Sequence, residues 1–329
     1  MADSMMIDRR FLLALLAGAG CAPGALARSM GPIPAPDREA MVPVKGGRIY
    51  VRVNGDLARA RPPLILIHGG PGGTHAAFLA ALPLASERAI ILYDQLDCGR
   101  SDRPDDPANW TVSRFVDEVD AIRAYFSIER AHVLGASWGG TVALEYGARQ
   151  PKGLESLILA SPLISTRSWL ADAAILRSEL PPETRDALTA CETAATPAQA
   201  VCDAATAAFY KAYNRREPAF DEAVAYKAAM PTAFSKHLYE TMWGASEFVS
   251  TGTLRDYDGE PLLERLRAPT LFLAGQYDEA RPATVAGFAR RVKGASFIEI
   301  EGSAHGLFDD RPEATRAAVR TWTRRHDKS

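Results

Sequence analysis

Short apolar runs bounded by glycine, proline or charged residues recur along much of this chain. They lie at 64–67, 89–94, 131–135, 157–160 and 270–275; an alternating segment at 48–53 precedes them, and a further strand signal at 296–300 follows. A short continuous apolar run is typical of a strand buried on both faces. Helical patterns lie between and after these runs, at 113–126, 139–149 and 313–325. The alternation predicts an α/β fold, with a mainly parallel sheet and helices on both faces.

Residues 163–254 have a different pattern. The segment is rich in Ala, Glu and aromatic residues, is broken by prolines such as Pro197 and Pro231, and contains no buried-strand run. A length of 329 residues allows either two units of about 150 residues or one large domain with an insertion. The pattern favours the insertion: an α/β core formed by 28–162 and 255–329, interrupted by a helical cap at 163–254.

The first 27 residues indicate export. Arg9 and Arg10 precede the apolar run FLLALLAGAG, and Ala25-Leu26-Ala27 provides a small-residue cleavage site. This order predicts a secretory signal peptide, and the paired arginines resemble a twin-arginine signal. The run is too short to cross a bilayer, so no stable membrane anchor is expected. A periplasmic or secreted protein follows; the alternative is a disordered or helical N-terminal extension.

Composition and charge exclude several classes of protein. A hydrophobic share of 47% is ordinary for a globular chain, and a net charge of −2 gives no electrostatic basis for binding nucleic acid. Cys191 and Cys202 would remain after signal cleavage, and their proximity in sequence allows a disulfide in an oxidising compartment. Two free thiols on a helical segment are equally compatible with the pattern.

The sequence GASWG at 135–139 is a candidate nucleophile site. It fits G-x-S-x-G, follows a predicted buried strand and precedes a predicted helix. In that context a tight strand-to-helix turn lifts the hydroxyl of Ser137 above the sheet, and the helix N-terminus stabilises negative charge beside it. The pattern alone occurs often by chance, so the strand–turn–helix context carries this prediction.

A base and an orienting carboxylate are expected at later strand ends. Asp278 follows the strand at 270–275, and His305 follows the strand at 296–300. The chain order Ser137, Asp278, His305 is that of an α/β-hydrolase. Alone, either residue could be an ordinary turn or loop residue, but all three at strand ends predict a catalytic triad.

Two backbone N–H groups are expected to form an oxyanion hole. One belongs to Trp138, directly after the candidate nucleophile, and the other to the loop HGGPGG at 68–73. Gly70 is the preferred donor in that loop and Gly69 the second choice. A phosphate-binding loop is disfavoured because the spacing matches neither nucleotide motif. This chemistry implies no metal and no cofactor.

Several motifs together resemble the proline iminopeptidases, a branch of the α/β-hydrolases that also includes amino-acid amidases. The motifs are HGGPGG at 68–73, YDQLDCGRS at 93–101, GASWGG at 135–140, MWGASEF at 242–248, GQYDE at 275–279 and GSAH at 302–305. The resemblance implies a Ser–Asp–His triad, a helical cap and release of N-terminal residues, often proline, from short peptides or amino-acid amides.

The resemblance also implies that Glu247 and Glu279 bind the α-ammonium of the substrate. Paired carboxylates in a partly dry pocket would select a free N-terminus. One departure is Asp97, where the family commonly has glycine; it could alter substrate preference or form a local turn bond. Two other hypotheses remain, an esterase or lactonase without an amine requirement and a non-catalytic binding protein.

Overall fold

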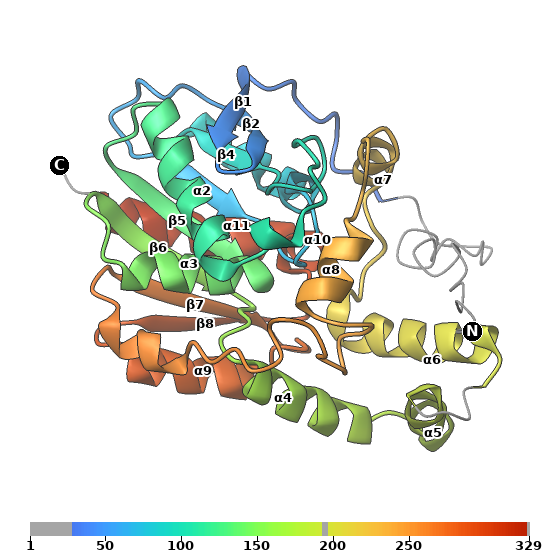
Figure 1. Ribbon diagram of the computed structural model, residues 1–329. Coiled ribbons are helices and arrows are strands. Elements are labelled where there is room, and N and C mark those ends of the chain that lie inside the picture. The colour runs from blue at the N-terminus through green and yellow to red at the C-terminus, as the bar shows by residue number, and fades with distance from the viewer. Residues whose placement is uncertain (1–27, 193–196, 328–329) are drawn as a thin grey trace.

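The fold is built on one eight-stranded sheet in a computed structural model that describes residues 28–192 and 197–327. The predicted signal peptide, 1–27, lies outside the described residues. The strand order is β1-β2-β4-β3-β5-β6-β7-β8; β2 pairs antiparallel with β1 and β4, and the other pairs are parallel (Figure 1). The strands are β1 (Arg38–Val44), β2 (Gly47–Asn54), β3 (Leu64–Ile67), β4 (Ile90–Tyr93), β5 (Ala131–Ala136), β6 (Leu154–Ala160), β7 (Thr270–Gly275) and β8 (Ser296–Ile300).

The central strands are apolar throughout because both faces of the sheet are covered. In β3, Ile65 and Ile67 join one hydrophobic cluster, whereas Leu64 and Leu66 join a second. The first cluster contains residues of the helices α2 (Val112–Tyr125), α3 (Trp138–Ala148) and α9 (Pro282–Arg291), and the second contains residues of η1 (His75–Ser86) and α11 (Pro312–Arg325). The continuous apolar run is therefore two alternating sets of core residues, which confirms the predicted α/β class.

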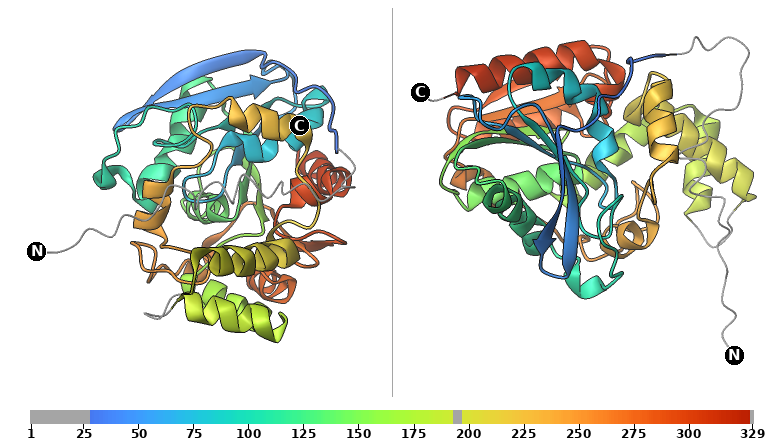
Figure 2. Two further views of the ribbon diagram at one scale, coloured as in Figure 1. Left: turned by 90° about the vertical axis from the view of Figure 1, so that its right-hand side faces the viewer. Right: turned by 90° about the horizontal axis from the view of Figure 1, so that it is seen from above.

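The helices fall into a core group and a group inserted between β6 and β7, as Figure 2 shows from two further sides. The core group is η1 (His75–Ser86), η2 (Pro107–Asn109), α2 (Val112–Tyr125), α3 (Trp138–Ala148), η4 (Glu260–Arg265), α9 (Pro282–Arg291), α10 (Leu307–Asp310) and α11 (Pro312–Arg325). The inserted group is α4 (Thr166–Ser178), α5 (Pro182–Cys191), α6 (Gln199–Phe209), the π-helical turn η3 (Tyr210–Asn214), α7 (Asp221–Ala228) and α8 (Lys236–Met242).

The inserted helices have little core of their own. Where 163–254 is described, it contains no strand beyond isolated bridges. Its separate hydrophobic cluster has only a few fully buried members, among them Leu176, Leu188 and Phe209. Other apolar residues of the insertion join the clusters of the α/β core, among them Trp169, Leu238 and Met242 in the first and Phe220 and Met230 in the second. Packing against the core therefore helps to hold these helices in place.

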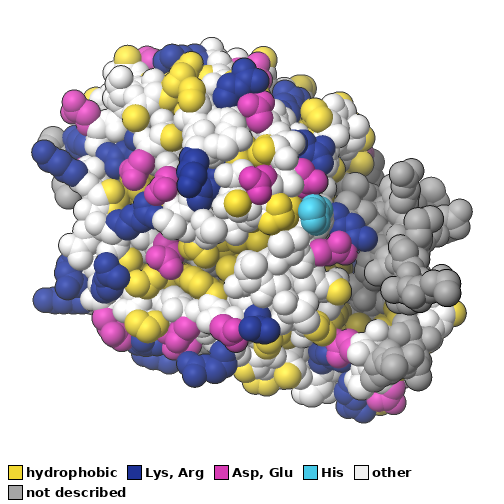
Figure 3. Space-filling model, viewed as in Figure 1, with side chains coloured by type: hydrophobic (Ala, Val, Ile, Leu, Met, Phe, Trp, Pro, Cys, Tyr) yellow, Lys and Arg dark blue, Asp and Glu magenta, His cyan; other side chains and the backbone are white. Residues whose placement is uncertain are grey.

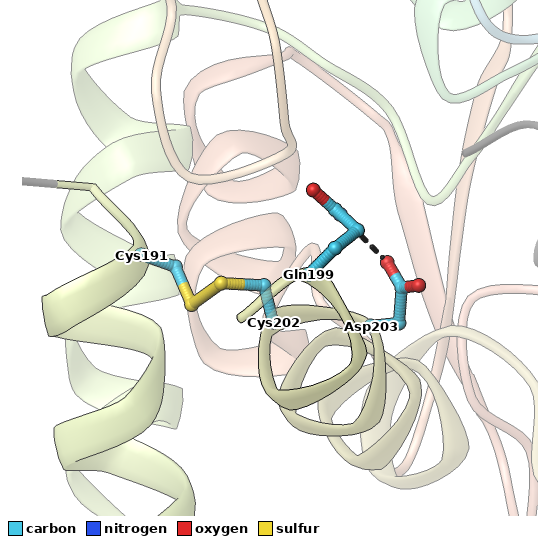
Figure 4. The surroundings of a disulfide bond; sticks show 4 residues. All are labelled: Cys191, Gln199, Cys202 and Asp203. Carbon is cyan, nitrogen blue, oxygen red and sulfur yellow. Dashed lines mark hydrogen bonds between the residues drawn. A yellow bond between two sulfur atoms is a disulfide. The ribbon is translucent and has the colours of Figure 1, made fainter. Parts of the chain in front are cut away.

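A disulfide joins α5 to α6 (Figure 4). Cys191 and Cys202 are bonded, with their Cα atoms 5.8 Å apart, so the structure resolves the alternative that the sequence left open in favour of the bridge. Cys202 is buried, and the next residue, Asp203, accepts a hydrogen bond from the side chain of Gln199 at 2.9 Å. The bridge therefore fixes one end of α6 against α5.

The surface carries both signs of charge. On the face drawn in Figure 3, basic and acidic side chains are interspersed rather than gathered into separate patches. This distribution agrees with the net charge of −2. Over 28–192 and 197–327, no helix combines the length and apolar character that crossing a membrane would require.

Candidate active site

Ser137 occupies a strained turn between β5 and α3. Its φ of 56° and ψ of −123° lie in a region that side-chain-bearing residues rarely adopt. The backbone is held there because the Ser137 N–H donates to the carbonyl of Ala160 at 3.0 Å and the Ser137 carbonyl accepts the N–H of Leu163 at 3.1 Å. The surrounding sheet thus fixes the position of the hydroxyl.

The two glycines of the motif are required by close backbone packing. A Cβ on Gly135 would lie 2.0 Å from the carbonyl oxygen of Gly139. A Cβ on Gly139 would lie 2.0 Å from the carbonyl oxygen of Ile67. Any side chain at either position would force the turn open and displace Ser137, which is the physical content of the G-x-S-x-G pattern.

Asp278 and His305 form a hydrogen-bonded pair from two neighbouring strand ends. His305 Nδ1 lies 2.7 Å from Asp278 Oδ1, which also accepts the N–H of Ala280 at 2.9 Å. The second oxygen, Oδ2, accepts the N–H of Gly275 and the hydroxyl of Ser161. Four donors hold this buried carboxylate, so it is fixed in place and orients the imidazole.

One cavity of about 370 Å³ brings together most of the residues that the sequence nominated. Its walls include Ser137, His305, Gly70, Glu247 and Glu279. Gly69 lines it too, and a Cβ there would lie 3.5 Å from the Ser137 hydroxyl. Trp138 is buried outside this wall but begins α3, so its backbone N–H has no acceptor within the helix. The structure therefore brings these residues together at one edge of the sheet.

Gln95 links the glycine loop to the nucleophile turn. Its side-chain amide donates to the His68 carbonyl at 2.9 Å, and its amide oxygen accepts the indole N–H of Trp138 at 2.9 Å. The Gln95 backbone N–H also donates to His68 Nε2 at 3.1 Å. One side chain therefore holds both segments that carry the candidate oxyanion donors. Gln95 lies within the motif YDQLDCGRS, which by itself indicates no role for this residue.

Glu279 is buried beside the imidazole, and Glu247 is partly buried at the same wall of the cavity. Glu279 Oε1 lies 3.6 Å from His305 Nε2, and the Tyr239 hydroxyl donates to Glu247 Oε1 at 2.6 Å. Burial raises the pKa of Glu279 to about 8 and also raises the pKa of Glu247. Burial alone lowers the pKa of His305, but Glu279 and Asp278 outweigh it and raise that pKa to about 9. Acids and imidazole thus titrate together.

Side chains from the inserted helices surround these acids and His305, and they belong to no recognisable sequence motif. Asn214 in η3 donates to Glu279 Oε1 at 2.6 Å, and Tyr239 in α8 contacts Glu247. Trp169 in α4 packs edge-on against His305, with ring centroids 5.6 Å apart. These residues come from separate helices with no fixed spacing, so only the tertiary structure identifies them.

Asp97 does not line the cavity. Its Oδ1 accepts the N–H of Asp105 at 2.7 Å, and its Oδ2 accepts the indole N–H of Trp110 at 2.8 Å. The residue has a φ of 66°, a left-handed conformation in which glycine is favoured and aspartate is tolerated. Of the two roles considered for this carboxylate, the structure supports local bonding within the loop.

The chemistry available to the cavity comes from side chains and backbone amides. Across 28–192 and 197–327, the His, Cys, Asp and Glu side chains form no group that could hold a metal ion. The arrangement offers a hydroxyl on a strained turn, an imidazole oriented by a carboxylate, and the acids Glu247 and Glu279 at the same wall. This combination suits acyl transfer from a substrate that carries a positive charge near its carbonyl.

The sequence of this chain is similar to that of known proteins. Residues 62–312 match the family model for the alpha/beta hydrolase fold, so the chain is an α/β-hydrolase. It is 37% identical over 300 residues to a proline iminopeptidase of Levilactobacillus brevis, covering 88% of this chain and 98% of that one. It is 34% identical over 282 residues to the proline iminopeptidase of Heyndrickxia coagulans, covering 85% and 96%. The chain therefore belongs to the proline iminopeptidase family.

A solved structure supports the same assignment. The crystal structure of a proline iminopeptidase from Mycobacterium smegmatis is 36% identical and has a TM-score of 0.81. It covers 88% of this chain and 99% of that one, so the similarity includes the inserted helices as well as the core. Family membership confirms the resemblance drawn from the motifs and supports hydrolase and aminopeptidase activity.

Proposed function

We propose that this protein is a serine aminopeptidase that releases N-terminal residues from short peptides or amino-acid amides through an acyl-enzyme. The observation that carries the proposal is the pair of acids formed by the buried Glu279 and the partly buried Glu247, at the wall that also contains Ser137 and His305. Among the described residues, no donor lies within hydrogen-bonding distance of Glu279 Oε2. An unpaired buried carboxylate oxygen favours a cationic ligand, and an α-ammonium group supplies one.

In the proposed reaction, His305 Nε2 takes the proton from the Ser137 hydroxyl as its oxygen attacks the substrate carbonyl. Asp278 holds the imidazole through Nδ1 and stabilises the cation that forms. The backbone amides of Gly70 and Trp138 stabilise the oxyanion. His305 then returns the proton to the leaving amine, and a water molecule activated by the same imidazole releases the acyl group.

The wall beyond the acids favours an apolar first residue. Phe78, Phe234, Leu307 and Phe308 line the cavity, and proline or another small apolar side chain would bury its surface against them. The relatives named above are proline iminopeptidases, which supports proline as the first substrate to test.

We further propose that the enzyme acts in the periplasm or outside the cell. The disulfide between Cys191 and Cys202 supports an oxidising compartment, since such bridges rarely persist in a reducing cytosol. The predicted signal peptide adds to this argument. Mass spectrometry of protein recovered from the periplasm or medium would test both points, with cleavage expected after Ala27.

The direct test of the mechanism is Ser137→Ala, assayed on proline p-nitroanilide. Removing the nucleophile should lower kcat by about 10⁶-fold while the far-ultraviolet circular dichroism is unchanged. A fluorophosphonate probe should label the wild-type protein at Ser137 and leave the variant unlabelled. Full activity in the variant, or an intact protein that resists labelling, would favour a non-catalytic binding protein.

The alternative is an esterase or lactonase of the same fold without an amine requirement. N-acetylation of proline p-nitroanilide removes the positive charge of its α-amine. Glu247 and Glu279 should therefore disfavour binding of the acetylated substrate. We expect kcat/KM to fall by at least about 100-fold, as for loss of a charge pair in a dry site. Equal activity on the N-acetylated and the free-amine substrate would support the esterase or lactonase hypothesis instead.

A further inference from the structure

The π-helical turn η3 contacts both loops that carry the reacting acids and base. The carbonyl of Tyr213 accepts the backbone N–H of Glu279 at 3.2 Å and that of His305 at 3.1 Å. The carbonyl of Asn214 accepts the N–H of Gly306 at 2.8 Å. A single turn of the inserted helices therefore joins two loops that follow different strands of the core. Short π-helical segments are frequent at functional sites.

The two oxygens of Glu279 have different surroundings. Oε1 accepts the side-chain N–H of Asn214 at 2.6 Å and lies 3.6 Å from His305 Nε2, which is too long for a hydrogen bond. Oε2 is buried without a partner in the described structure. Asn214 therefore occupies the oxygen that faces the imidazole, and leaves the other oxygen available to a ligand.

We propose that Asn214 is a positioning residue that directs Glu279 toward the substrate amine and prevents it from binding the nitrogen of His305 that must accept the proton. This inference rests on the proposed function. Asn214 itself touches neither the base nor the nucleophile. It acts by holding one carboxylate at a set distance from the base. The same contact would thus serve substrate selection and catalysis.

The groups around Glu279 favour its movement toward His305 if Asn214 does not hold it. Glu279 faces His305 and Asp278 from the core loops, Glu247 from the segment after α8, and the hydroxyls of Tyr210 and Tyr239 from η3 and α8. The only cationic partner among these is the protonated imidazole. A carboxylate released from Asn214 would move toward it, because an ion pair in a buried site is strongly favoured over an isolated charge.

The test compares Asn214→Leu and Asn214→Asp, both close to asparagine in size, with Lys211→Ala as the matched control on the same turn. Lys211 is exposed and does not line the cavity. On proline p-nitroanilide, both Asn214 variants should raise KM by about tenfold or more, the usual effect of losing a hydrogen bond to a charged group. Lys211→Ala should remain within about twofold of wild type.

The decisive readout uses a fluorophosphonate probe, which carries no amine and reports only on Ser137 and His305. In Asn214→Leu, pairing of Glu279 with the imidazole should move the acid limb of the labelling-rate profile to higher pH. Adding Glu279→Gln to Asn214→Leu should return that limb to lower pH, because no carboxylate remains to hold the imidazolium. A merely structural defect would not be rescued by the second substitution.

The outcomes separate this inference from the function on which it rests. If Glu279→Gln raises KM for the free amine while Asn214→Leu leaves KM and the labelling profile unchanged, the role of Asn214 is wrong and the aminopeptidase proposal stands. If Ser137→Ala keeps activity, the proposed function itself is wrong. A raised KM, a shifted profile and rescue in the double variant would establish the positioning role.

Discussion

Two of the histidine–aspartate pairs in this molecule have nearly the same geometry and different surroundings. His75 Nδ1 lies 2.8 Å from Asp94 Oδ1, and His305 Nδ1 lies 2.7 Å from Asp278 Oδ1. Both acids follow strands of the same sheet. The difference lies at the far nitrogen: His75 Nε2 contacts the hydroxyl of Tyr226 at 2.8 Å, whereas His305 lines the cavity with Ser137.

The comparison shows that the pair by itself does not define a catalytic site. The His75 and Asp94 side chains have 0% exposure, and the pair joins η1, the loop after β4 and helix α7. It holds an inserted helix against the core. The His305 side chain keeps 12% exposure and an accessible nitrogen. A histidine–aspartate pair can serve chemistry when its second nitrogen faces a nucleophile and substrate space.

The largest expected contrast is between Asp278→Asn and Asp94→Asn. Asp278→Asn should lower kcat by about 10⁴-fold, because an amide no longer orients the imidazole or stabilises its cation. Asp94→Asn should instead destabilise the fold by about 3 kcal/mol, with kcat of the folded enzyme close to wild type. Steady-state kinetics and urea unfolding of both variants measure this. A large decrease in kcat in folded Asp94→Asn would show that the His75–Asp94 pair also takes part in catalysis.

Acid destabilisation should come from two other buried histidines. Burial lowers the pKa of His68 to about 4 and that of His132 to about 4, both below the 6.5 of an exposed histidine. Between pH 6.5 and pH 4 the unfolded chain therefore binds more protons than the folded protein. The free energy of unfolding consequently decreases as pH falls from 6.5 to 4. Each histidine should contribute roughly 3 kcal/mol to that loss.

Urea unfolding at pH 7.0 and 4.5 measures this dependence for wild type and for His132→Gln. The variant should lose markedly less stability on acidification, since the glutamine does not titrate. His237→Gln is the matched control, because His237 is exposed and should leave the pH dependence unchanged. An identical acid loss in wild type and His132→Gln would show that burial does not keep this histidine neutral.

The smallest expected effect is that of Tyr226→Phe. The substitution removes the hydroxyl that contacts His75 Nε2 at 2.8 Å and accepts from Arg52 at 3.1 Å. Leaving these groups unpaired should cost about 1–2 kcal/mol of unfolding free energy, with kcat and KM unchanged. Thermal unfolding and kinetics on one preparation suffice. A fall in kcat without loss of stability would mean that the second pair also influences the cavity.

The sequence predicted the central strands well because both of their faces are buried. The runs at 64–67 and 270–275 coincide with β3 and β7, and 131–135 lies within β5. Strand β1 was not predicted, since it lies at the sheet edge and Val42 is its one fully buried residue. Helix α9 was also missed. Hydrophobic pattern identifies elements in proportion to the apolar surface that they bury.

At the candidate active site, the sequence nominated the residues that lie in loops directly after strands. Ser137, Asp278 and His305 were found because parallel strands deliver their following loops to one edge of the sheet. Asn214 and Tyr239 were not found, since they reach the acids from inserted helices whose packing leaves no fixed spacing in the chain.

The sequence by itself determined the α/β class and the family, and it nominated Ser137, Asp278 and His305 as a triad, because short-range rules of burial and turn geometry act within a few residues. Only the tertiary structure decided which of two histidine–aspartate pairs faces a cavity, and that Cys191 bonds to Cys202. It also placed the side chain of Asn214 in hydrogen-bonding contact with one oxygen of Glu279. These features depend on contacts between segments far apart in the chain, and no local pattern specifies which segments meet.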